Sequence, residues 1–324
     1  MSLAEFRYVK VRGPPLSPES FGGREPKLRD VTERVATEVH QVTAVELFDG
    51  VHWLRKEVYE VAKEVLRFSS YEAHEGVTFT SAKGAWLIVE EPKPVEPPLG
   101  APRDLRYVAI ETELSRKLNL GPIIIEEEFV FRGFKGEDVE VGRVLRHRYF
   151  VAAYRRDGTP LSEKELEKTL LWKNYLSKPE VLNVLGGVST FLRKKLWHLE
   201  RMNKEAMSKY KVVWRDAAKK FVPAIEVSGA IPDYTVNYVA VSSFEEACYL
   251  MAVLLAPRIN AVVEELSPWI GHVQPRFIKY FKIPKYDPRN NTHRQLAQIG
   301  KAIYERGEAS VKEINLIDEL VKVL

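Results

Sequence analysis

The sequence is poor in cysteine, because Cys248 is the only one among 324 residues. A single thiol excludes an internal disulfide and a metal cluster held by several thiolates. Cys248 lies in an apolar stretch with Ala247, Leu250 and Met251, and a buried core thiol is therefore expected at this position.

Long apolar runs are also lacking, because the most apolar stretch, residues 250–256, ends at Pro257. A helix that spans a bilayer needs roughly 18 or more apolar residues in succession. The sequence shows no signal-peptide pattern. We therefore expect a cytoplasmic protein with no membrane partner. Charged residues are abundant while Cys and Met are scarce, a balance typical of thermophile proteins.

Motifs that carry catalytic chemistry are missing too. The seven histidines are scattered without metal-ligand spacing, and no Gly-rich loop suits a nucleotide or adenosyl cofactor. Adenine-N6 DNA methyltransferases need an Asn/Asp-Pro-Pro-aromatic loop that holds the flipped base. The Pro-Pro pairs at 14–15 and 97–98 are preceded by glycine and glutamate and followed by leucine, so neither fits. No catalytic residue, metal ligand or cofactor site is predicted in this chain.

A proline-rich segment divides the chain. Five prolines fall between Glu91 and Arg103, a density that interrupts any helix or central strand. We predict a linker there, with an N-terminal mixed α/β region of unknown role at 1–100 and a second domain at 101–324. Both strand and helix patterns occur along the chain, and we predict an α+β fold.

The apolar periodicities predict individual elements. Strands are expected at 5–12, 39–48, 78–89, 123–134, 143–155, 211–214 and 234–241. Helices are expected at 53–68, 110–118, 161–176, 190–206, 243–256 and 294–306, with a further helical piece after Pro257 and an irregular stretch at 274–284.

Positive charge is concentrated in two stretches. Residues 193–220 hold ten Lys/Arg and three acids, and residues 276–306 hold eight Lys/Arg and two acids. The whole chain has a net charge of only +4, so the remainder is acidic overall. Such segregation predicts a basic face, whose usual partner is a polyanion.

Duplex DNA is the polyanion that these stretches fit, because Lys and Arg contacts to phosphates release counterions and supply most nonspecific affinity. The predicted DNA-binding residues are Arg193, Lys194, Lys195, Arg201, Lys204, Arg215, Lys219, Lys220, Gln274, Arg276, Lys279 and Lys282. His272, Asn203 and Asn290 also carry side chains of the type that reads base edges. Interleaved aromatic residues are candidates for stacking on bases, although Trp214 is expected in the core: Trp197, Tyr210, Trp214, Phe277, Tyr280 and Phe281.

An enzyme is the first alternative. The apolar string at residues 86–90 leads into Glu91 and Lys93, and metal-dependent nucleases place an acid and a lysine at a strand end. Asp49 is the upstream acid that would complete a Mg²⁺ site. The competing interpretation is a strand that runs into the proline-rich linker.

Residues 105–305 resemble the C-terminal specificity domain of TaqI-type and Eco57I-type adenine-N6 DNA methyltransferases. The resemblance rests on NYL at 174–176, LR at 192–193, KVVWR at 211–215, YLMAVLL at 249–255 and FKIP at 281–284, with RQLAQI at 294–299 in the place of the following helix. Two places depart from the family pattern. Ala256-Pro257 stands in place of Asn-Ser, and Pro284-Lys285-Tyr286 in place of Pro-x-Pro.

The resemblance implies a target-recognition module that binds duplex DNA as part of a restriction-modification system and does not methylate by itself. S-adenosylmethionine is then expected only with a catalytic domain or subunit, and a methyltransferase or nuclease subunit is the implied protein partner. A general nucleic-acid-binding interaction protein, including an RNA binder, is the second alternative.

Overall fold

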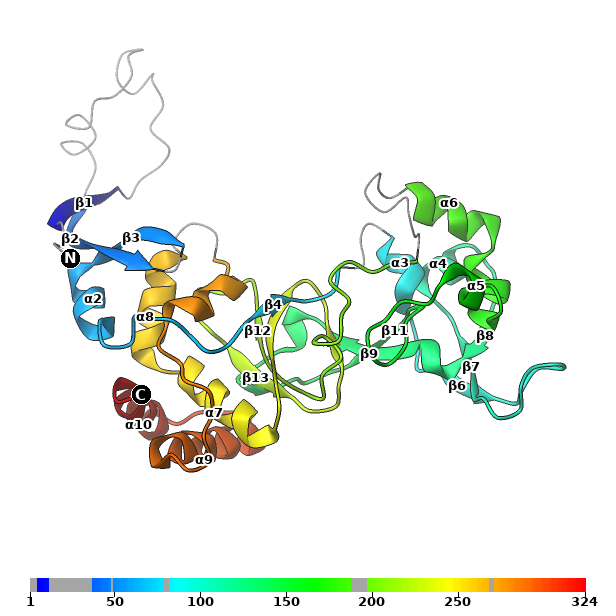
Figure 1. Ribbon diagram of the computed structural model, residues 1–324. Helices are drawn as coiled ribbons and strands as arrows, with labels where there is room; N and C mark the ends of the chain where they lie inside the picture. The colour runs from blue at the N-terminus through cyan, green and yellow to red at the C-terminus, as the bar shows by residue number, and fades with distance from the viewer. Residues whose placement is uncertain (1–4, 12–36, 48, 79–81, 188–196, 268–270) are drawn as a thin grey trace, which may run out of the picture.

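The computed structural model describes residues 5–11, 37–47, 49–78, 82–187, 197–267 and 271–324. Helices and sheets alternate along the chain, which confirms the predicted α+β class. The molecule is elongated (Figure 1): the N-terminal strands and helices α7 to α10 lie at one end, and helices α3 to α6 lie at the other. A five-stranded sheet, called the waist sheet below, lies between the two ends.

The N-terminal strands form an antiparallel sheet of β1(Glu5–Val11), β2(Thr37–Leu47) and β3(Gly50–Arg55). Gly50 lies at the tight turn between β2 and β3. Its φ of 137° is a value that glycine adopts readily and residues with a side chain rarely adopt. The helix predicted at 53–68 was wrong at its start, because residues up to Arg55 pair with β2 and only α2(Lys56–Ala62) is helical.

The waist sheet has the order β10(Gly142–Arg143), β13(Pro223–Glu226), β12(Tyr210–Arg215), β15(Val236–Val241) and β4(His74–Glu75). Strands β12 and β15 were predicted within two residues of their ends, whereas β13 was not predicted. Strand β12 pairs antiparallel with both neighbours, so that Val213 lies between Ala224 and Tyr238. The sheet therefore joins residues that are far apart in the sequence.

The other end of the molecule holds two smaller sheets, one of β14(Ile231–Pro232), β9(Val130–Phe134), β11(Arg148–Val151) and β5(Leu87–Ile88), the other of β6(Lys93–Val95), β7(Tyr107–Ile110) and β8(Ile123–Glu126). Around them lie α3(Lys83–Trp86), α4(Glu113–Lys117), α5(Glu163–Leu166), the π-helical turn η4(Trp172–Leu176) and α6(Pro179–Gly187). The continuous elements predicted at 78–89, 123–134, 143–155 and 161–176 are each broken into shorter pieces. The periodicity of apolar residues in the sequence does not reveal where these breaks fall.

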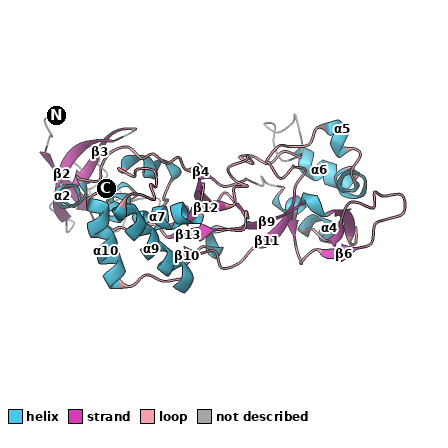
Figure 2. Cartoon of the chain, turned by 60° about the horizontal axis from the view of Figure 1, so that its bottom comes forward, coloured by secondary structure: helices cyan, strands magenta, loops and turns pink. Residues whose placement is uncertain are grey.

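The C-terminal helices are α7(Phe244–Leu254), α8(Pro257–Leu266), α9(Asn291–Arg306) and α10(Val311–Lys322), with the 3₁₀ turn η5(Pro275–Tyr280) between α8 and α9. The Ser243 side chain accepts a hydrogen bond from the backbone of Glu246 and caps α7, the helix predicted at 243–256. Figure 2 shows α9 and α10 side by side. Among the described residues no single helix is long and apolar enough to cross a membrane, whereas α7 and α8 pass that test only as a pair bent by 64°.

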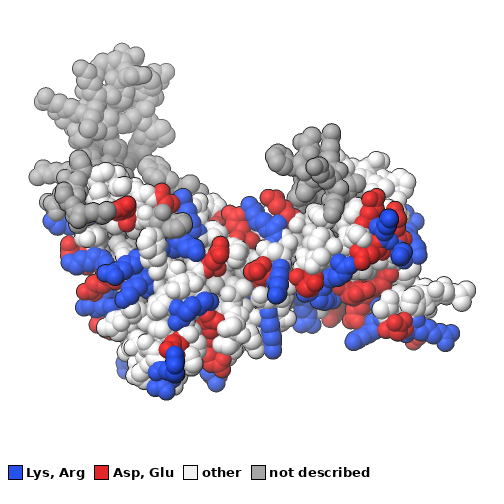
Figure 3. All heavy atoms as spheres, in the orientation of Figure 1, with Lys and Arg blue, Asp and Glu red and all other residues white. Residues whose placement is uncertain are grey.

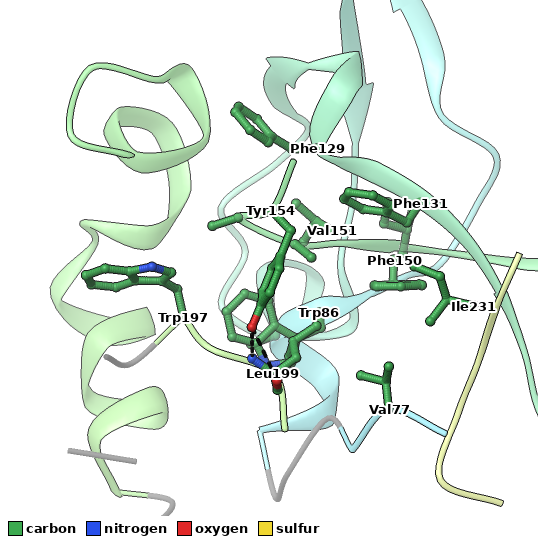
Figure 4. Packing of buried hydrophobic residues seen from close by; sticks show 14 of the residues in the cluster. Val77, Trp86, Phe129, Phe131, Phe150, Val151, Tyr154, Trp197, Leu199 and Ile231 are labelled. Carbon is green, nitrogen blue, oxygen red and sulfur yellow. Dashed lines mark hydrogen bonds between the residues drawn. The ribbon is translucent and has the colours of Figure 1, made fainter. Parts of the chain in front are cut away.

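Two hydrophobic clusters fill the molecule, and the waist sheet contributes to both. Val213 and Tyr238 pack into a cluster with Trp86, Phe150 and Tyr154, part of which appears in Figure 4. The alternate residues Val212, Trp214 and Val239 pack into the second cluster with α7 and α8. Successive side chains of a strand point to opposite faces, so each face of this sheet belongs to a different core. The predicted boundary between a domain at 1–100 and a domain at 101–324 stays a prediction.

A lysine is buried within the waist sheet. Lys211 is 0% exposed, its Nζ donates to the carbonyl of Ser208, and it pairs across the sheet with Glu226. Burial lowers the pKa of Lys211 to about 8, against the attraction of Glu226. Glu226 itself accepts a hydrogen bond from the His147 ring at 2.9 Å and another from Ser228. A buried ionic group therefore lies in the element that both cores share.

A glycine allows helices α7 and α9 to pack in close contact. A Cβ added to Gly300 in α9 would lie 2.0 Å from the backbone oxygen of Cys248 in α7. Cys248 is 1% exposed, as predicted, and burial raises the pKa of its thiol to about 12.

The Gly300→Ala variant is expected to lose about 1–3 kcal/mol of unfolding free energy, because the added methyl group forces α7 and α9 apart. Gly186→Ala is the matched control, since no atom lies within 4 Å of its added Cβ and alanine favours a helix by about 0.5–1 kcal/mol. Chemical denaturation of both variants measures the difference. Equal stability of the two would contradict this account of the helix contact.

The Lys211→Met variant isolates the titration of the buried lysine. Between pH 8 and 10.5 the unfolded chain keeps a proton on Lys211 that the folded chain has released, so rising pH favours folding. Relative to the variant, the wild type should gain up to about 3 kcal/mol of unfolding free energy across this window and nothing below it. Urea denaturation of both proteins from pH 7 to 10.5 measures the gain, and a constant difference would refute it.

Candidate nucleic-acid interface

Five segments of chain meet at one end of the waist sheet. Ala217 pairs with His272, the backbone of Asp216 donates to Thr235, that of Tyr234 donates to Val77, and Thr78 pairs with Glu200. These contacts bring together the segments that carry six exposed or half-buried side chains, which we call the waist band: Arg201, Lys204, Lys219, Lys220, Tyr234 and His272. The band brings together four predicted DNA-binding residues from two parts of the sequence.

The helix predicted at 190–206 is wrong where the structure describes it, because residues 197–206 form turns. Arg201 has a φ of +64°, a left-handed conformation outside any right-handed helix. The Tyr154 hydroxyl bonds both the N–H and the carbonyl of Leu199 (Figure 4). The indole N–H of Trp197 donates to the carbonyl of Leu161. These contacts with other segments override the helical periodicity. Arg193, Lys194 and Lys195 lie outside the described residues.

Arg201 and Lys204 reach the waist band from this irregular segment. The Arg201 guanidinium donates to the Thr78 hydroxyl at 3.0 Å and forms a 2.6 Å ion pair with Glu75. Lys204 is exposed. Asn203, a candidate for base reading, instead accepts hydrogen bonds from the Ala206 backbone and the Tyr238 hydroxyl. Its side-chain oxygen is therefore committed to local structure.

Lys219 and Lys220 lie in the connection between β12 and β13, and both are exposed. Arg215, at the end of β12, is half-buried on the opposite face, where its guanidinium donates to the carbonyl of Val139 at 2.7 Å. Its Nε is buried without a partner among the described atoms. Strand alternation thus separates Arg215 from Trp214, which faces the other core.

The remaining predicted residues lie on a second surface, the η5 segment, which comprises residues 274–282. Gln274 precedes the turn, and Lys279 and Lys282 are half-buried. Arg276 is paired with Asp49 at 3.0 Å, so its charge is partly neutralised. Asn290, the other base-reading candidate, caps α9 through a hydrogen bond from His293.

Most of the aromatic residues proposed for stacking are core residues. Trp197, Trp214, Phe277, Tyr280 and Phe281 are each at most 8% exposed. Trp214 also donates its indole N–H to Val273 at 2.8 Å, which confirms the expectation of a core position. Tyr210 is half-buried. The exposed ring in the waist band is Tyr234, at 50%, which the sequence did not single out because no cation lies within ten residues of it.

Ion pairs interrupt the predicted basic face. On the face seen in Figure 3, Lys and Arg side chains are interspersed with Asp and Glu. Acids from distant parts of the chain explain the mixture, since Glu75 pairs with Arg201, Asp49 with Arg276, and Glu246 with Lys285. Charge that is segregated along the sequence is therefore partly mixed by folding.

The metal site proposed for a nuclease is not assembled. Asp49 lies at the N-terminal sheet, where it accepts hydrogen bonds from Tyr280 and His52 at 2.7 Å each. Burial alone would raise the pKa of Asp49, but these two bonds hold it below the usual value. Glu91 lies at the opposite end of the molecule, beside β6 (Figure 1), and accepts a hydrogen bond from Tyr149. Asp49 and Glu91 therefore do not share a metal ion.

Glu91 and Lys93 instead line a groove of about 980 Å³ between β6 and β9. Both acidic and basic side chains line it, among them Glu127, Arg132 and Arg156. In the described part of the chain, no group of three or more His, Cys, Asp and Glu residues is arranged to hold a metal ion.

The chain was compared with protein families, curated proteins and solved structures. No protein-family model and no curated protein matches the chain. Among solved structures, it is similar to the type IIL restriction-modification enzyme MmeI, determined in complex with DNA, with 8% sequence identity and a TM-score of 0.44 over 78% of this chain. The chain spans 32% of the length of that enzyme.

Proposed function

We propose that this chain binds duplex DNA and serves as the target-recognition part of a restriction-modification system, without catalysing a reaction itself. The observation that carries the proposal is the waist band. It collects exposed cations and one exposed aromatic ring at the end of a rigid sheet. Loops placed on a rigid scaffold are where proteins most often bind their ligands.

The cations of the waist band suit phosphate contacts. Lys204, Lys219 and Lys220 are exposed and carried by turns, so their ammonium groups can follow the sugar-phosphate backbone. Arg201 is held against Thr78 and Glu75, which fixes the direction of its guanidinium. Phosphate contacts position a protein on DNA and carry no sequence information, so recognition needs further side chains.

The assignment to target recognition in a restriction-modification system rests on the resemblance to the TaqI-type specificity domain. The segment KVVWR at 211–215 forms the central strand β12, and YLMAVLL at 249–255 forms the buried helix α7. Both motifs therefore support the scaffold that carries the waist band. A methyltransferase or nuclease subunit, with S-adenosylmethionine in the first case, would supply the chemistry.

A second candidate function is binding to single-stranded nucleic acid or RNA. The observation in its favour is Tyr234, since an exposed ring beside cations is the arrangement on which unpaired bases stack.

Selection from a random duplex library, followed by salt titration of the selected site, tests the proposal. We expect one enriched sequence and an affinity that falls linearly with the logarithm of salt concentration. Competition with single-stranded DNA and RNA separates the two candidates. Failure to bind any duplex at low salt would overturn the main proposal.

The paired substitution Lys219→Gln and Lys220→Gln should reduce the slope of log affinity against log salt by about 2, because two phosphate contacts are lost. The matched control is Lys164→Gln with Lys168→Gln, which removes the same charge from exposed positions in and beside α5 at the far end of the molecule. Fluorescence anisotropy across a salt series measures both slopes. An equal slope change in the two variants would contradict the placement of the interface.

A further inference from the structure

A histidine in the waist band is held by an acid and an amide. Asp216 accepts a hydrogen bond from Nδ1 of His272 through Oδ2, and its Oδ1 accepts one from Nδ2 of Asn237 at 3.1 Å. The same Asn237 nitrogen also donates to the carbonyl of Val273 at 2.8 Å, and Asn237 is 0% exposed. The His272 side chain is 40% exposed. Its ring therefore has a fixed inner edge and an outer edge open to solvent.

This arrangement fixes the tautomer of His272. An ionised carboxylate only accepts hydrogen bonds, so Nδ1 must carry the proton that Asp216 receives. In the neutral ring the proton on Nδ1 leaves Nε2 as an acceptor. The backbone holds the ring in place as well, because Val273 donates to the carbonyl of Asp216 and the Ser267 hydroxyl donates to that of His272. The waist band thus presents one oriented acceptor among its cations.

We propose that His272 reads an exocyclic amino group in the major groove of bound DNA, with Asp216 and Asn237 as positioning residues. The inference rests on the proposed function and names the base chemistry that this site recognises. Adenine N6 and cytosine N4 are the amino donors in the major groove, whereas guanine and thymine present acceptors at the corresponding positions. One position of the target should therefore favour adenine or cytosine over guanine or thymine.

A phosphate fits this acceptor poorly. Phosphate oxygens accept hydrogen bonds, and the Nε2 of the neutral ring has no proton to donate. The neighbouring Lys219 and Lys220 supply donors for phosphates instead. In protein–DNA complexes, contacts to phosphates generally position the protein and contacts to bases specify the sequence. The cations and the acceptor of the waist band fit these two roles.

The hydrogen bonds around Asp216 make its amide variant informative. In Asp216→Asn, the side-chain oxygen is expected to stay opposite the Asn237 donor, which places the new NH₂ group opposite Nδ1 of His272. The amide then donates to Nδ1, so the ring proton moves to Nε2. Nε2 becomes a donor, and the preference at the same position should change from adenine or cytosine to guanine or thymine.

Parallel selections from one random duplex library test the proposal, with the wild type, His272→Ala and Asp216→Asn. We expect His272→Ala to reduce the ratio of affinities for the preferred and the other bases at a single position by about tenfold. This is the size of effect usual for one mismatched base pair. Asp216→Asn should invert the preference at that same position. Thermal unfolding and residual binding to an unrelated duplex at low salt verify that each variant is folded.

Two controls match these changes. His52→Ala removes another histidine bound to an aspartate, 2.7 Å from Asp49, and Asp104→Asn removes an exposed carboxylate at the far end. Both should keep the selected sequence.

Other outcomes overturn the inference while leaving DNA binding intact. A uniform loss of affinity in His272→Ala with an unchanged sequence would assign His272 to a phosphate. A position that instead requires guanine N2 would place the ring in the minor groove. If Asp216→Asn left the preference unchanged, Asp216 would not set the tautomer. Absence of binding to any duplex by the wild type would refute the proposed function itself.

Discussion

Burial of the waist sheet on both faces is the constraint on which the rest of the structure depends. Strand β12 alternates between two cores, with Val213 on one side and Val212 and Trp214 on the other. A slip of one residue in its pairing would exchange the two sets of side chains, so both cores specify the same register. The fixed register of the strands also fixes the positions at which the loops at the end of this sheet begin and end. The waist band, including His272 and its partner Asp216 beside the band, is positioned by two hydrophobic cores at once.

Local patterns predicted the elements whose burial is regular. Strands β12 and β15 and helices α7 and α9 were recognised, because their side chains follow one period against one environment. Residues 197–206 were not, because hydrogen bonds from Tyr154 and Trp197 to distant backbone groups stabilise an irregular path there. Tertiary contacts of this kind leave no periodic signal in the sequence. Helix α10 also went unrecognised, although the sequence shows its capping box at Ser310 and Glu313.

The candidate site shows the same division. Sequence reasoning found the cations, since charge runs are visible in any sequence, and it brought Arg201, Lys204, Lys219 and Lys220 to attention. It did not foresee the acids that neutralise neighbouring cations, because Glu75 and Asp49 are more than 100 residues away from their partners Arg201 and Arg276. It named His272 for its side-chain type alone. Its partners Asp216 and Asn237 become visible only once the chain is folded.

The sharing of one sheet by two cores has a consequence for how such a protein changes over time. Substitutions inside β12 and β15 disturb both cores together, whereas Lys219 and Lys220 in the connection that follows β12 are exposed to solvent. Variation at these two exposed positions leaves the cores untouched, although Phe221 of the same connection belongs to the second core. The architecture therefore separates a doubly buried frame from exposed positions whose side chains can change without refolding the molecule.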